Sequence, residues 1–447
     1  MAKFTSQEIV QMNREYTFFS WSIQGQTNPI PVEKAEGIYF WDTDGKRYID
    51  FSSQLMNTNI GHQHPKVVKA IQEQAAKLCF VHPGNATEPR GLLGKKLAEV
   101  TPGNLKKTFF TLGGAEAVEN AIKIARFYTG RHKILARYRS YHGATHGSIA
   151  LTGDYRRLAV EPAMPGGVHF LDPFCYRCPF GQKKESCKRE CVSHLEEIIH
   201  YEGSDKIAAI IMEGVVGSNG LIIPPDDYWP RVREICNKYG ILLISDEVMS
   251  GWGRTGKWFA MDHWGVRPDI LTTAKGITTA YVPLGLCATT GKIASYFDDH
   301  YFSHGHTYEA HPLTLAPAVA AINEMKRLHI PDRALEMGDY MGKKLNDLKS
   351  AHPSIGDVRG IGLFWAVDLV KNRNTRQPFN TKADKVSGRP LLVDRVSADM
   401  MKNGVFMQAW ISHCVIAPPL IITKEEIDVG VKALDAALAI ADREVEA

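Results

Sequence analysis

The sequence lacks the features of an exported or membrane-spanning chain. Its first residues, MAKFTSQEIVQMNREYTFFSW, mix charged and polar side chains and contain no apolar core followed by a small-residue cleavage site. No apolar run approaches the roughly 20 residues needed to cross a bilayer. We therefore expect a soluble, cytoplasmic protein with no membrane partner.

An excess of charge of one sign is also missing. The 53 basic and 49 acidic side chains leave a formal charge of only +4, and no long block of one sign occurs. Such a balance creates no field strong enough to hold nucleic acid, so we expect small-molecule ligands instead. The short basic stretches near residues 183–189 and 381–389 are predicted to be solvated loops.

Cysteine is sparse except in one cluster within FCYRCPFGQKKESCKREC, formed by Cys175, Cys178, Cys187 and Cys191. A C-x2-C pair is a familiar half-site for zinc, because thiolates bind this metal strongly. The second pair, however, is spaced C-x3-C, and a chain of 447 residues does not need a metal to fold. We expect no metal; free thiols in a plain loop, a disulfide and a zinc site are the alternatives for this cluster.

The order of short apolar runs and helix-like stretches predicts an α/β fold. Strand candidates alternate with helical patterns, which is typical of a mostly parallel sheet covered on both faces. Helices are predicted over AEAVENAIKIARFYTG, ended by Gly130, and over DDYWPRVREICNKYG. In the opening residues, Asp44-Gly45 predicts a hairpin turn between two β-rich arms. The predicted strands are residues 107–112, 133–138, 207–213, 241–248, 269–274 and 284–290.

Length and pattern together predict two domains. A chain of this length exceeds one typical domain, and its 44% hydrophobic content can form more than one core. Long helical stretches followed by short strands replace the alternating pattern after residue 315. We predict a large α/β domain over residues 61–315, a small α+β domain over 316–447, and an N-terminal segment, 1–60, that packs with the small domain.

Three chemical features follow predicted strands, where open α/β sheets bind their ligands. Gly113-Gly114-Ala115 opens a helix, whose free N–H groups and positive dipole end suit a phosphate. Asp246 ends the apolar strand ILLIS and needs a cationic or N–H partner, which a protonated pyridine nitrogen would supply. Lys275 follows the strand DILTTA, where apolar surroundings lower an amine pKa and create a nucleophile.

Each feature alone has an ordinary structural explanation: a tight connection, an acid capping the next turn, and a surface lysine. Together they form a different pattern. A phosphate cradle, a carboxylate for a ring nitrogen and an amine nucleophile, each at a separate strand end of one sheet, are the parts that pyridoxal phosphate requires.

The same residues lie in stretches that resemble the class-III aminotransferases, which have the type I pyridoxal-phosphate fold and include the ω-transaminases. The resemblance runs from near residue 15 to the C-terminus, and Asp246 and Lys275 are 29 residues apart, as in that family. It is carried by GGAEAVENAIKIAR, YHGATHGS, HGHTYEAHP, APPLIIT and ISDEVMSGWGRTGKWFAMDHWGVRPDILTTAKGI.

The resemblance implies a role for each residue of a cofactor site built at a homodimer interface. Lys275 would carry pyridoxal phosphate covalently, and Asp246 would keep its ring nitrogen protonated. Tyr141 and Val248 would pack on opposite faces of the ring, and Thr307 would reach the phosphate bound by the neighbouring subunit. The remaining cofactor contacts are expected from Gly114 and Ala115 at the phosphate, from Glu213 near the ring hydroxyl, and from His142 beside Tyr141.

The sequence also departs from the family pattern around the substrate. Family members often bind the substrate carboxylate through an Arg shortly before APPLIIT, but the window GVFMQAWISHCVIAPPLIIT contains none, and Gln408 or Trp410 occupies the place. Met56 stands where several ω-transaminases have an aromatic residue, and Trp21 completes the predicted substrate pocket. Ser218 stands where members that use glutamate or 2-oxoglutarate often carry Glu.

These departures predict donors without an α-carboxylate and favour pyruvate over 2-oxoglutarate as the acceptor. The predicted function is therefore transfer of an amino group from an amine or ω-amino acid, such as taurine, β-alanine or a diamine, to a keto acid. An amino-acid racemase, epimerase, aminomutase or decarboxylase on the same fold is the alternative reaction class. A binding protein that has lost catalysis is disfavoured by the presence of both Lys275 and Asp246.

Overall fold

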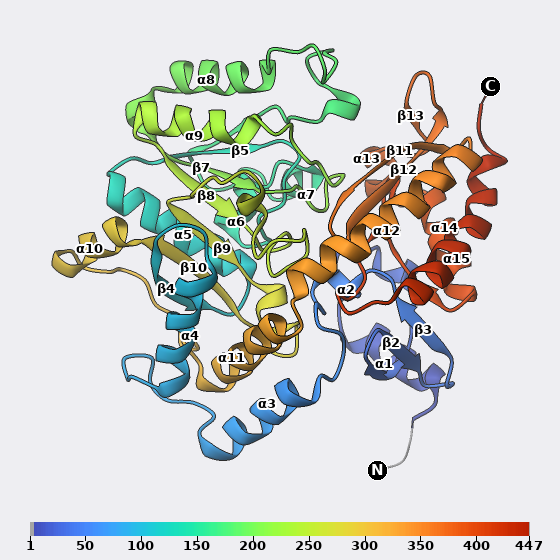
Figure 1. Cartoon of the computed structure of the whole chain (residues 1–447), viewed down its shortest axis with the longest axis horizontal. Coiled ribbons are helices and arrows are strands. Elements are labelled where there is room, and N and C mark those ends of the chain that lie inside the picture. Colours follow the sequence, from blue (N-terminus) through green and yellow to red (C-terminus); the bar gives the residue numbers. More distant parts are fainter. Residues whose placement is uncertain (1–3, 447) are drawn as a thin grey trace.

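The computed structural model describes residues 4–446, and its largest layer is a seven-stranded sheet (Figure 1). The strand order is β4-β10-β9-β8-β7-β5-β6. Neighbouring strands from β9 to β6 run parallel, whereas β10 runs antiparallel to both of its neighbours. The strands are β4 (Leu105–Thr111), β5 (Lys133–Arg137), β6 (Gly167–Phe170), β7 (Ile207–Glu213), β8 (Leu242–Asp246), β9 (Ile270–Thr273) and β10 (Gly285–Thr290).

The predicted α/β fold is confirmed, and the physical reason is burial on both faces of the sheet. Every residue of β7, β8 and β9 is buried, which explains why these strands are continuous apolar runs and not alternating ones. All six predicted strands form. The edge strand β6 was not predicted, because its four residues GVHF carry little β pattern and only Phe170 is fully buried.

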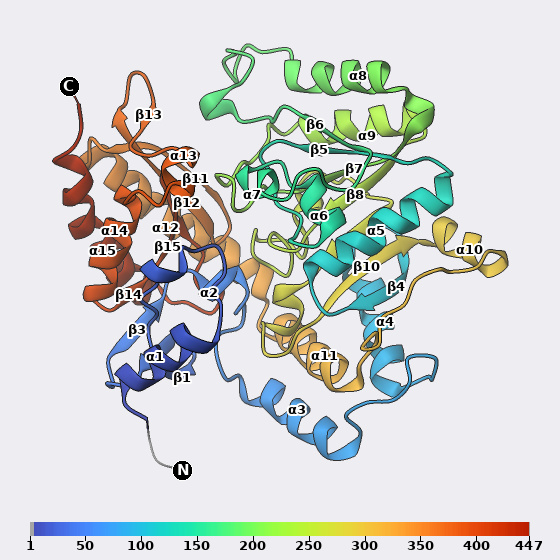
Figure 2. The ribbon, with the colours of Figure 1, turned by 180° about the vertical axis from the view of Figure 1, so that it is seen from behind.

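Helices cover both faces of this sheet (Figure 2). On one face, α5 (Gly114–Thr129) packs through Val118, Ile122 and Ala125 against apolar side chains of the sheet. On the other face, α8 (Glu190–Glu202) and α9 (Tyr228–Tyr239) form a separate apolar cluster with strand residues such as Met212. The predicted end of α5 is confirmed, because Gly130 has a left-handed backbone at φ +66°.

Two smaller sheets lie beside the large one and combine both ends of the chain. The predicted turn at Asp44-Gly45 joins β2 to β3, and β3 pairs in parallel with the C-terminal strand β14. The first small sheet contains β1 (Val32–Glu36), β2 (Tyr39–Asp42), β3 (Arg47–Asp50) and β14 (Val405–Phe406). The second contains β11 (Ile355–Ile361), β12 (Phe364–Asn372), β16 (His413–Ile416) and β15 (Gln408–Trp410), with β13 (Gln377–Pro378) paired to β12.

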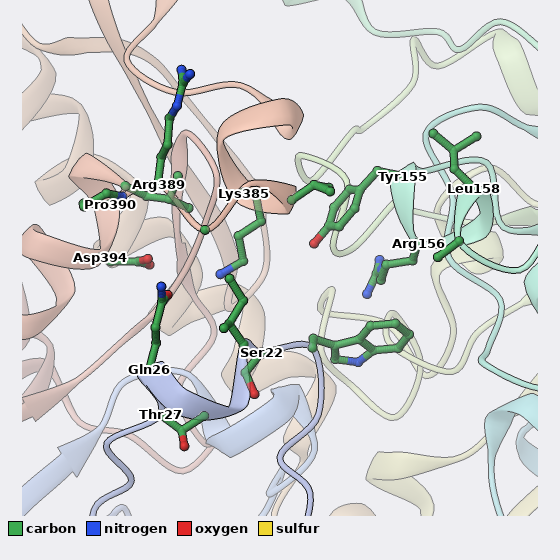
Figure 3. A pocket seen from close by; sticks show the side chains of 16 residues that line it. Ser22, Gln26, Thr27, Tyr155, Arg156, Leu158, Lys385, Arg389, Pro390 and Asp394 are labelled. Atoms are coloured by element: carbon green, nitrogen blue, oxygen red, sulfur yellow. The ribbon is translucent and has the colours of Figure 1, made fainter.

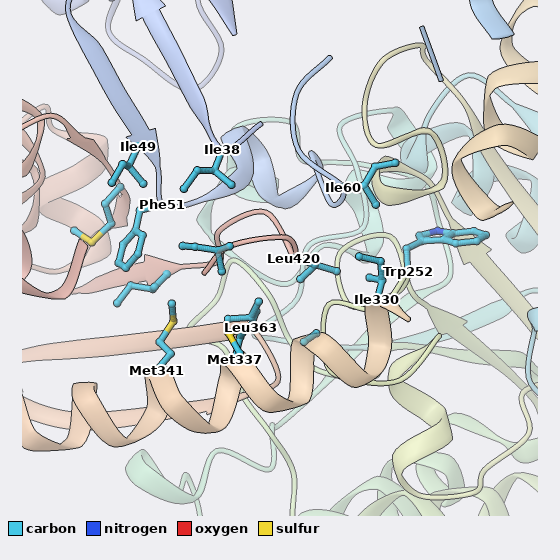
Figure 4. Close-up of a cluster of buried hydrophobic side chains, with 14 of the residues drawn as sticks. Ile38, Ile49, Phe51, Ile60, Trp252, Ile330, Met337, Met341, Leu363 and Leu420 are labelled. Atoms are coloured by element: carbon cyan, nitrogen blue, oxygen red, sulfur yellow. The ribbon is translucent and has the colours of Figure 1, made fainter. Parts of the chain in front are cut away.

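Three helices cover these small sheets: α12 (Ile330–Ala351), α14 (Leu392–Lys402) and α15 (Lys424–Asp442). Met337 and Met341 of α12 lie in one buried cluster with Phe51, which follows β3, and Leu363, which precedes β12 (Figure 4). The same cluster extends to Trp252 of the large sheet's loops. An apolar core therefore joins the N-terminal segment, the middle of the chain and the C-terminal region.

The other helices are short or lie at the edges of these layers. They are α1 (Ser6–Tyr16), α2 (Ser53–Met56), α3 (Pro65–Lys77), α4 (Glu88–Val100), α6 (His146–Leu151), α7 (Tyr155–Leu158), α10 (Gly291–Asp299), α11 (Pro312–Arg327) and α13 (Lys382–Val386). The boundary predicted at residue 315 falls inside α11, which packs against α3, α4 and the turn after β9. The division into domains therefore stays a prediction. Across residues 4–446, no helix is long and apolar enough to span a membrane.

Candidate active site

The strand ends of the large sheet surround a cavity of about 570 Å³, which we call the inner cavity. Asp246 is the last residue of β8, Lys275 follows β9 directly after Ala274, and Gly114 begins α5. The parallel strands place their carboxyl ends at one edge of the sheet, which explains why residues far apart in sequence meet here. Eight predicted cofactor residues line this cavity: Gly114, Ala115, Tyr141, His142, Glu213, Asp246, Val248 and Lys275.

The start of α5 forms one end of the inner cavity. Gly113 occupies the N-cap position, and no side chain caps the first turn, so its N–H groups remain open to an anion. A Cβ on Gly143 would lie 2.6 Å from the Cβ of Ala115, and the φ of Gly143 is +139°. Only glycine fits this contact, so the loop that carries Gly143 can pack directly against the first turn of α5.

Asp246 is almost completely buried but has two hydrogen-bond partners. Its Oδ2 atom lies 2.6 Å from Nδ1 of His142, and its Oδ1 atom accepts the backbone N–H of Val248 at 3.0 Å. The Nε2 atom of His142 has no hydrogen-bond partner among the described residues. The carboxylate is thus fixed at the end of β8 and faces the inner cavity.

Glu213 ends the neighbouring strand β7 and holds two loops of the site. Its carboxylate accepts the backbone N–H of Tyr141 at 3.1 Å and that of Gly217 at 2.7 Å. Burial raises the pKa of Glu213, the charge of His142 lowers it, and Asp246 raises it further. The Tyr141 loop and the loop after β7 therefore share one buried acceptor.

Lys275 has the properties of an amine nucleophile. Desolvation by burial lowers the pKa of its ammonium group to about 8, although the nearby carboxylates of Asp246 and Glu213 act in the opposite direction. Its backbone has φ +53°, a left-handed conformation that is unusual for a residue other than glycine. Such strain, together with a lowered amine pKa, is typical of functional sites.

Arg156 is a site residue that the sequence did not identify. Its guanidinium group lies 3.8 Å from the ring centre of Tyr141 and 5.2 Å from the ring of Trp21. Trp21 meets Tyr141 edge to face, with ring centres 6.1 Å apart. These three side chains form a partition between the inner cavity, which Tyr141 lines, and a second cavity, which Trp21 and Arg156 line. The Asp-Tyr-Arg-Arg motif indicates a helix start, because Asp154 is the N-cap residue of α7. It does not indicate the position of the Arg156 guanidinium, which depends on the tertiary fold.

A second cavity of about 920 Å³, the outer cavity, lies on the other side of this partition. Arg156 lines it from one side and Lys385 of α13 from the other, with the Tyr155 hydroxyl between them (Figure 3). Trp21, which lies against Arg156, also lines this cavity. The prediction of a solvated loop for 381–389 is wrong at this point. Residues 382–386 form the helix α13, which Thr381 caps, and Lys385 is half-buried in the cavity wall.

The predicted substrate-pocket residues are not all brought together. Trp21 lines the outer cavity, whereas Met56, Gln408 and Trp410 line neither cavity. Met56 is 2% exposed, has a left-handed backbone at φ +53°, and lies in a buried cluster against which Trp410 packs. Gln408 belongs to β15, and its backbone N–H donates a hydrogen bond to Oγ of Ser52 at 2.8 Å. A direct substrate contact of these three residues is therefore an expectation that the geometry does not support.

Two further predictions concern residues outside the cavities. Thr307 is exposed and does not line the inner cavity of its own chain, so its role at a neighbouring subunit stays a prediction. All eight cysteines are free thiols, including the four in the cluster. Within residues 4–446, no group of three or more His, Cys, Asp or Glu side chains is placed to hold a metal ion.

Comparison with known proteins gives one family. The sequence matches the family described as Aminotransferase class-III over residues 22–438. The leucine/methionine racemase of Thermococcus litoralis is 40% identical over 423 residues, which cover 92% of this chain and 91% of that protein. The taurine–pyruvate aminotransferase of Bilophila wadsworthia is 32% identical over 452 aligned positions, with 98% of each chain covered.

A solved structure is similar over the whole length. The taurine:2-oxoglutarate aminotransferase from Bifidobacterium kashiwanohense, determined in complex with pyridoxal phosphate and glutamate, has 41% sequence identity to this chain. The two chains superpose with a TM-score of 0.95, and the match covers 100% of each. The sequence relationship and the fold therefore agree.

Proposed function

Since the chain belongs to the class-III aminotransferases, we propose that its inner cavity holds pyridoxal phosphate and that Lys275 and Asp246 are its catalytic residues. The protein is a pyridoxal-phosphate-dependent aminotransferase, which moves an amino group from an amine or ω-amino acid to a keto acid such as pyruvate. The observation that carries the residue assignment is the meeting of an uncapped helix start, a buried carboxylate and a partly buried amine with a lowered pKa around one cavity.

The residues present fit this cofactor. The open N–H groups at the start of α5 suit its phosphate, and the fixed carboxylate of Asp246 suits its protonated ring nitrogen. Val248 and Tyr141 line the cavity as packing surfaces for a ring, and His142 is buried beside Asp246. When bound, pyridoxal phosphate supplies the electron sink that stabilises a substrate carbon after it loses a proton.

The chain's own residues provide the proton transfer and the orientation. With a pKa of about 8, the Lys275 amine can lose and regain a proton near neutral pH, as a general base and acid must. Asp246 supplies a fixed carboxylate at the end of β8, and Glu213 holds the Tyr141 loop in place. These groups are arranged before the substrate arrives, which lowers the cost of reorganising charge during the reaction.

The position of Arg156 favours amino donors that carry an acid group at the end remote from the reacting amine. A guanidinium group has five N–H groups, and the two on Nη1 form no hydrogen bond with residues 4–446. Arg156 is also the cation at the partition between the two cavities, where the tail of a donor would lie. We therefore place an ω-amino acid, with a carboxylate or a sulfonate such as that of taurine, ahead of an uncharged amine as the donor.

A homodimer with shared sites is the second part of the proposal. Phe80 and Tyr308 are large, exposed side chains whose rings meet at 6.1 Å, and Thr307 lies beside them. Exposed aromatic residues that form a cluster are typical of surfaces that another protein covers. We propose that a second copy of the chain covers this surface and that Thr307 binds the cofactor phosphate of that copy.

Initial rates with a panel of donors and keto acids test this function. The natural protein is expected to transfer the amino group of taurine or β-alanine to pyruvate, and pyruvate is expected to exceed 2-oxoglutarate as acceptor. In Arg156→Gln, kcat/KM for taurine should fall by roughly tenfold or more, since a charged hydrogen bond contributes about 1.5 to 3 kcal/mol. Arg157→Gln is the matched control, because Arg157 pairs with Glu161 and lines another cavity.

Two outcomes would contradict the proposal. If the natural protein transfers no amino group from any donor in the panel, the aminotransferase function is wrong. If Arg156→Gln and Arg157→Gln lower the rate with taurine equally, or if Arg156→Gln lowers the rate with an uncharged amine as strongly as with taurine, the donor class is wrong.

Racemisation is the second candidate, since the leucine/methionine racemase of Thermococcus litoralis is 40% identical over almost the whole chain. Both reactions need the same proton transfer at a lysine, so the inner cavity serves either one. They differ in whether the amino group leaves the substrate, and this difference is directly measurable.

A further inference from the structure

The loop after β7 holds Arg156 in place through two neighbouring residues, Ser218 and Asn219. The Nη2 atom of Arg156 donates to Oγ of Ser218 at 3.0 Å. The side-chain amide of Asn219 donates to Oδ2 of Asp154 at 2.9 Å, and Asp154 in turn accepts the Nε–H of Arg156 at about 3 Å. The loop therefore binds both members of the Arg156–Asp154 ion pair.

This arrangement uses one edge of the guanidinium group and leaves the other open. Nε and Nη2 supply three N–H groups, which Asp154 and Ser218 accept. The guanidinium group stacks on the ring of Tyr141 and lies beside Trp21, and these contacts hold the plane of the group. The two N–H groups of Nη1 are then the edge that can receive an acid group, and the side chain is only 13% exposed.

The side chain at position 218 decides how much negative charge contacts Arg156, and Ser218 is neutral. Ser218 lines the inner cavity, whereas Arg156 lines the outer cavity, so their hydrogen bond crosses the partition. A hydroxyl group accepts a hydrogen bond from Arg156 but adds no charge. Asp154 is then the only carboxylate bound to Arg156 among the described residues, and a carboxylate at position 218 would compete directly with a bound acid.

We propose that Ser218 is a specificity-determining residue, which keeps the Arg156 guanidinium available for the acid group of ω-amino acid donors, and that Asn219 is a positioning residue acting through Asp154. This inference rests on the donor class given under the proposed function. It assigns the preference for an acidic donor to a loop of the large sheet and not to the strand β15, where Gln408 and Trp410 lie.

Charge at position 218 is the quantity to vary, and Ser218→Glu and Ser218→Gln are the matched pair. Both variants introduce a long side chain, but only the first adds a negative charge beside Arg156. In Ser218→Glu, the ratio of kcat/KM for taurine to kcat/KM for an uncharged amine should fall by roughly tenfold, which corresponds to about 1.4 kcal/mol. In Ser218→Gln this ratio should fall by less than about threefold, because size changes without charge.

A binding measurement separates this inference from the proposed function. Ethanesulfonate carries the acid group but no amine, so the natural holoenzyme can bind it without reacting, and calorimetry gives its Kd. We expect a Kd about tenfold higher in Ser218→Glu than in Ser218→Gln. In Asn219→Ala the Kd should rise while kcat for an uncharged amine stays close to that of the natural protein, since only the orientation of Arg156 changes.

The outcomes are distinguishable. If Arg156→Gln leaves the Kd of ethanesulfonate unchanged, the acid site of the proposed function is wrong. If Arg156→Gln raises this Kd but Ser218→Glu and Ser218→Gln have equal values, the role of Ser218 is wrong while the acid site remains. If Asn219→Ala has the Kd of the natural protein, the positioning role of Asn219 is wrong.

Discussion

Nδ1 of His142 lies 2.6 Å from Oδ2 of Asp246, although the two residues are 104 positions apart in the sequence. The other carboxylate oxygen accepts the N–H of Val248, so both oxygens of Asp246 are engaged by the protein. A carboxylate held in this way keeps its position without a ligand. The structure therefore provides a pre-arranged negative charge at the end of β8.

Removing this charge should slow turnover without preventing cofactor binding. Asp246→Asn keeps the shape of the side chain but loses the charge that favours a protonated ring nitrogen. We expect kcat to fall by roughly 10²- to 10³-fold, the effect of losing one pre-arranged electrostatic group. Stopped-flow or steady-state kinetics on protein loaded with cofactor measures this change, and near-normal turnover in Asp246→Asn would refute the role.

Lys275 should react as an amine with a pKa of about 8. Because this value lies below that of an ordinary lysine, the neutral, nucleophilic amine becomes abundant as pH rises through about 8. In protein stripped of cofactor, the rate of covalent capture of pyridoxal phosphate should therefore rise between pH 7 and 9 and then level off. Borohydride reduction followed by peptide mass spectrometry locates the modified lysine.

In Lys275→Ala, the reducible label should disappear, and turnover should fall by roughly 10²- to 10⁴-fold because a general acid–base group is lost. A reducible label on another lysine of this variant would show that Lys275 is not the attachment site. A capture rate that rises only near pH 10 would contradict the lowered pKa.

Thr307 tests the shared site. Thr307→Ala should raise the dissociation constant of pyridoxal phosphate by roughly tenfold, since one hydrogen bond to a charged phosphate is lost, and the label on Lys275 should remain. Ser303→Ala is the control, because Ser303 is an exposed hydroxyl residue of the same segment. Sedimentation that shows a fully active monomer would overturn the proposal of a shared site.

The raised pKa of Glu247 predicts how the free energy of unfolding depends on pH. It is completely buried and accepts hydrogen bonds from Ser250 and from the backbone of Ala260 and Met261. Burial raises the pKa of Glu247 to about 7, whereas these hydrogen bonds lower it and only partly offset the burial. Since the unfolded chain has the ordinary value near 4.5, the folded state binds more protons between about pH 4.5 and 7.

The free energy of unfolding should therefore contain a contribution that is present below pH 4.5 and is lost as pH rises to 7. Glu247→Gln removes this titration, so its decline with pH should be shallower by up to ~1.4 kcal/mol per pH unit. Urea unfolding of both proteins at several pH values between 5 and 7 gives the difference. Other buried carboxyl groups contribute equally to both curves, and parallel curves would contradict the assignment to Glu247.

Much of the large sheet could be predicted because its strands are continuous apolar runs. The positions of Asp246 and Lys275 followed from the same signal, since both residues end or follow such a run, and parallel strands bring their ends together. The edge strand β6 was missed because its burial is partial and its sequence is short. The local sequence pattern was sufficient to predict a strand where the whole strand is buried.

The substrate side of the site could not be predicted in this way. Arg156 and Lys385 are 229 positions apart and meet at the outer cavity only through the tertiary fold. Met56 and Trp410 were expected in the pocket, but they pack in one apolar cluster and line neither cavity. A residue's distance along the chain from a recognised motif does not determine which way its side chain points, and left-handed turns such as that at Met56 are not visible in an apolar pattern.

The central claim is that this chain is an aminotransferase and not a racemase, and a single-turnover experiment without an acceptor tests it most directly. Holoenzyme is mixed with excess taurine or β-alanine in the absence of any keto acid, and the carbonyl product released from the donor is quantified. Our account predicts close to one equivalent of carbonyl product per subunit, followed by continued release only after pyruvate is added. If no carbonyl product forms while the enzyme exchanges the α-proton of leucine or methionine with solvent and inverts its configuration, the account is contradicted and the protein is a racemase.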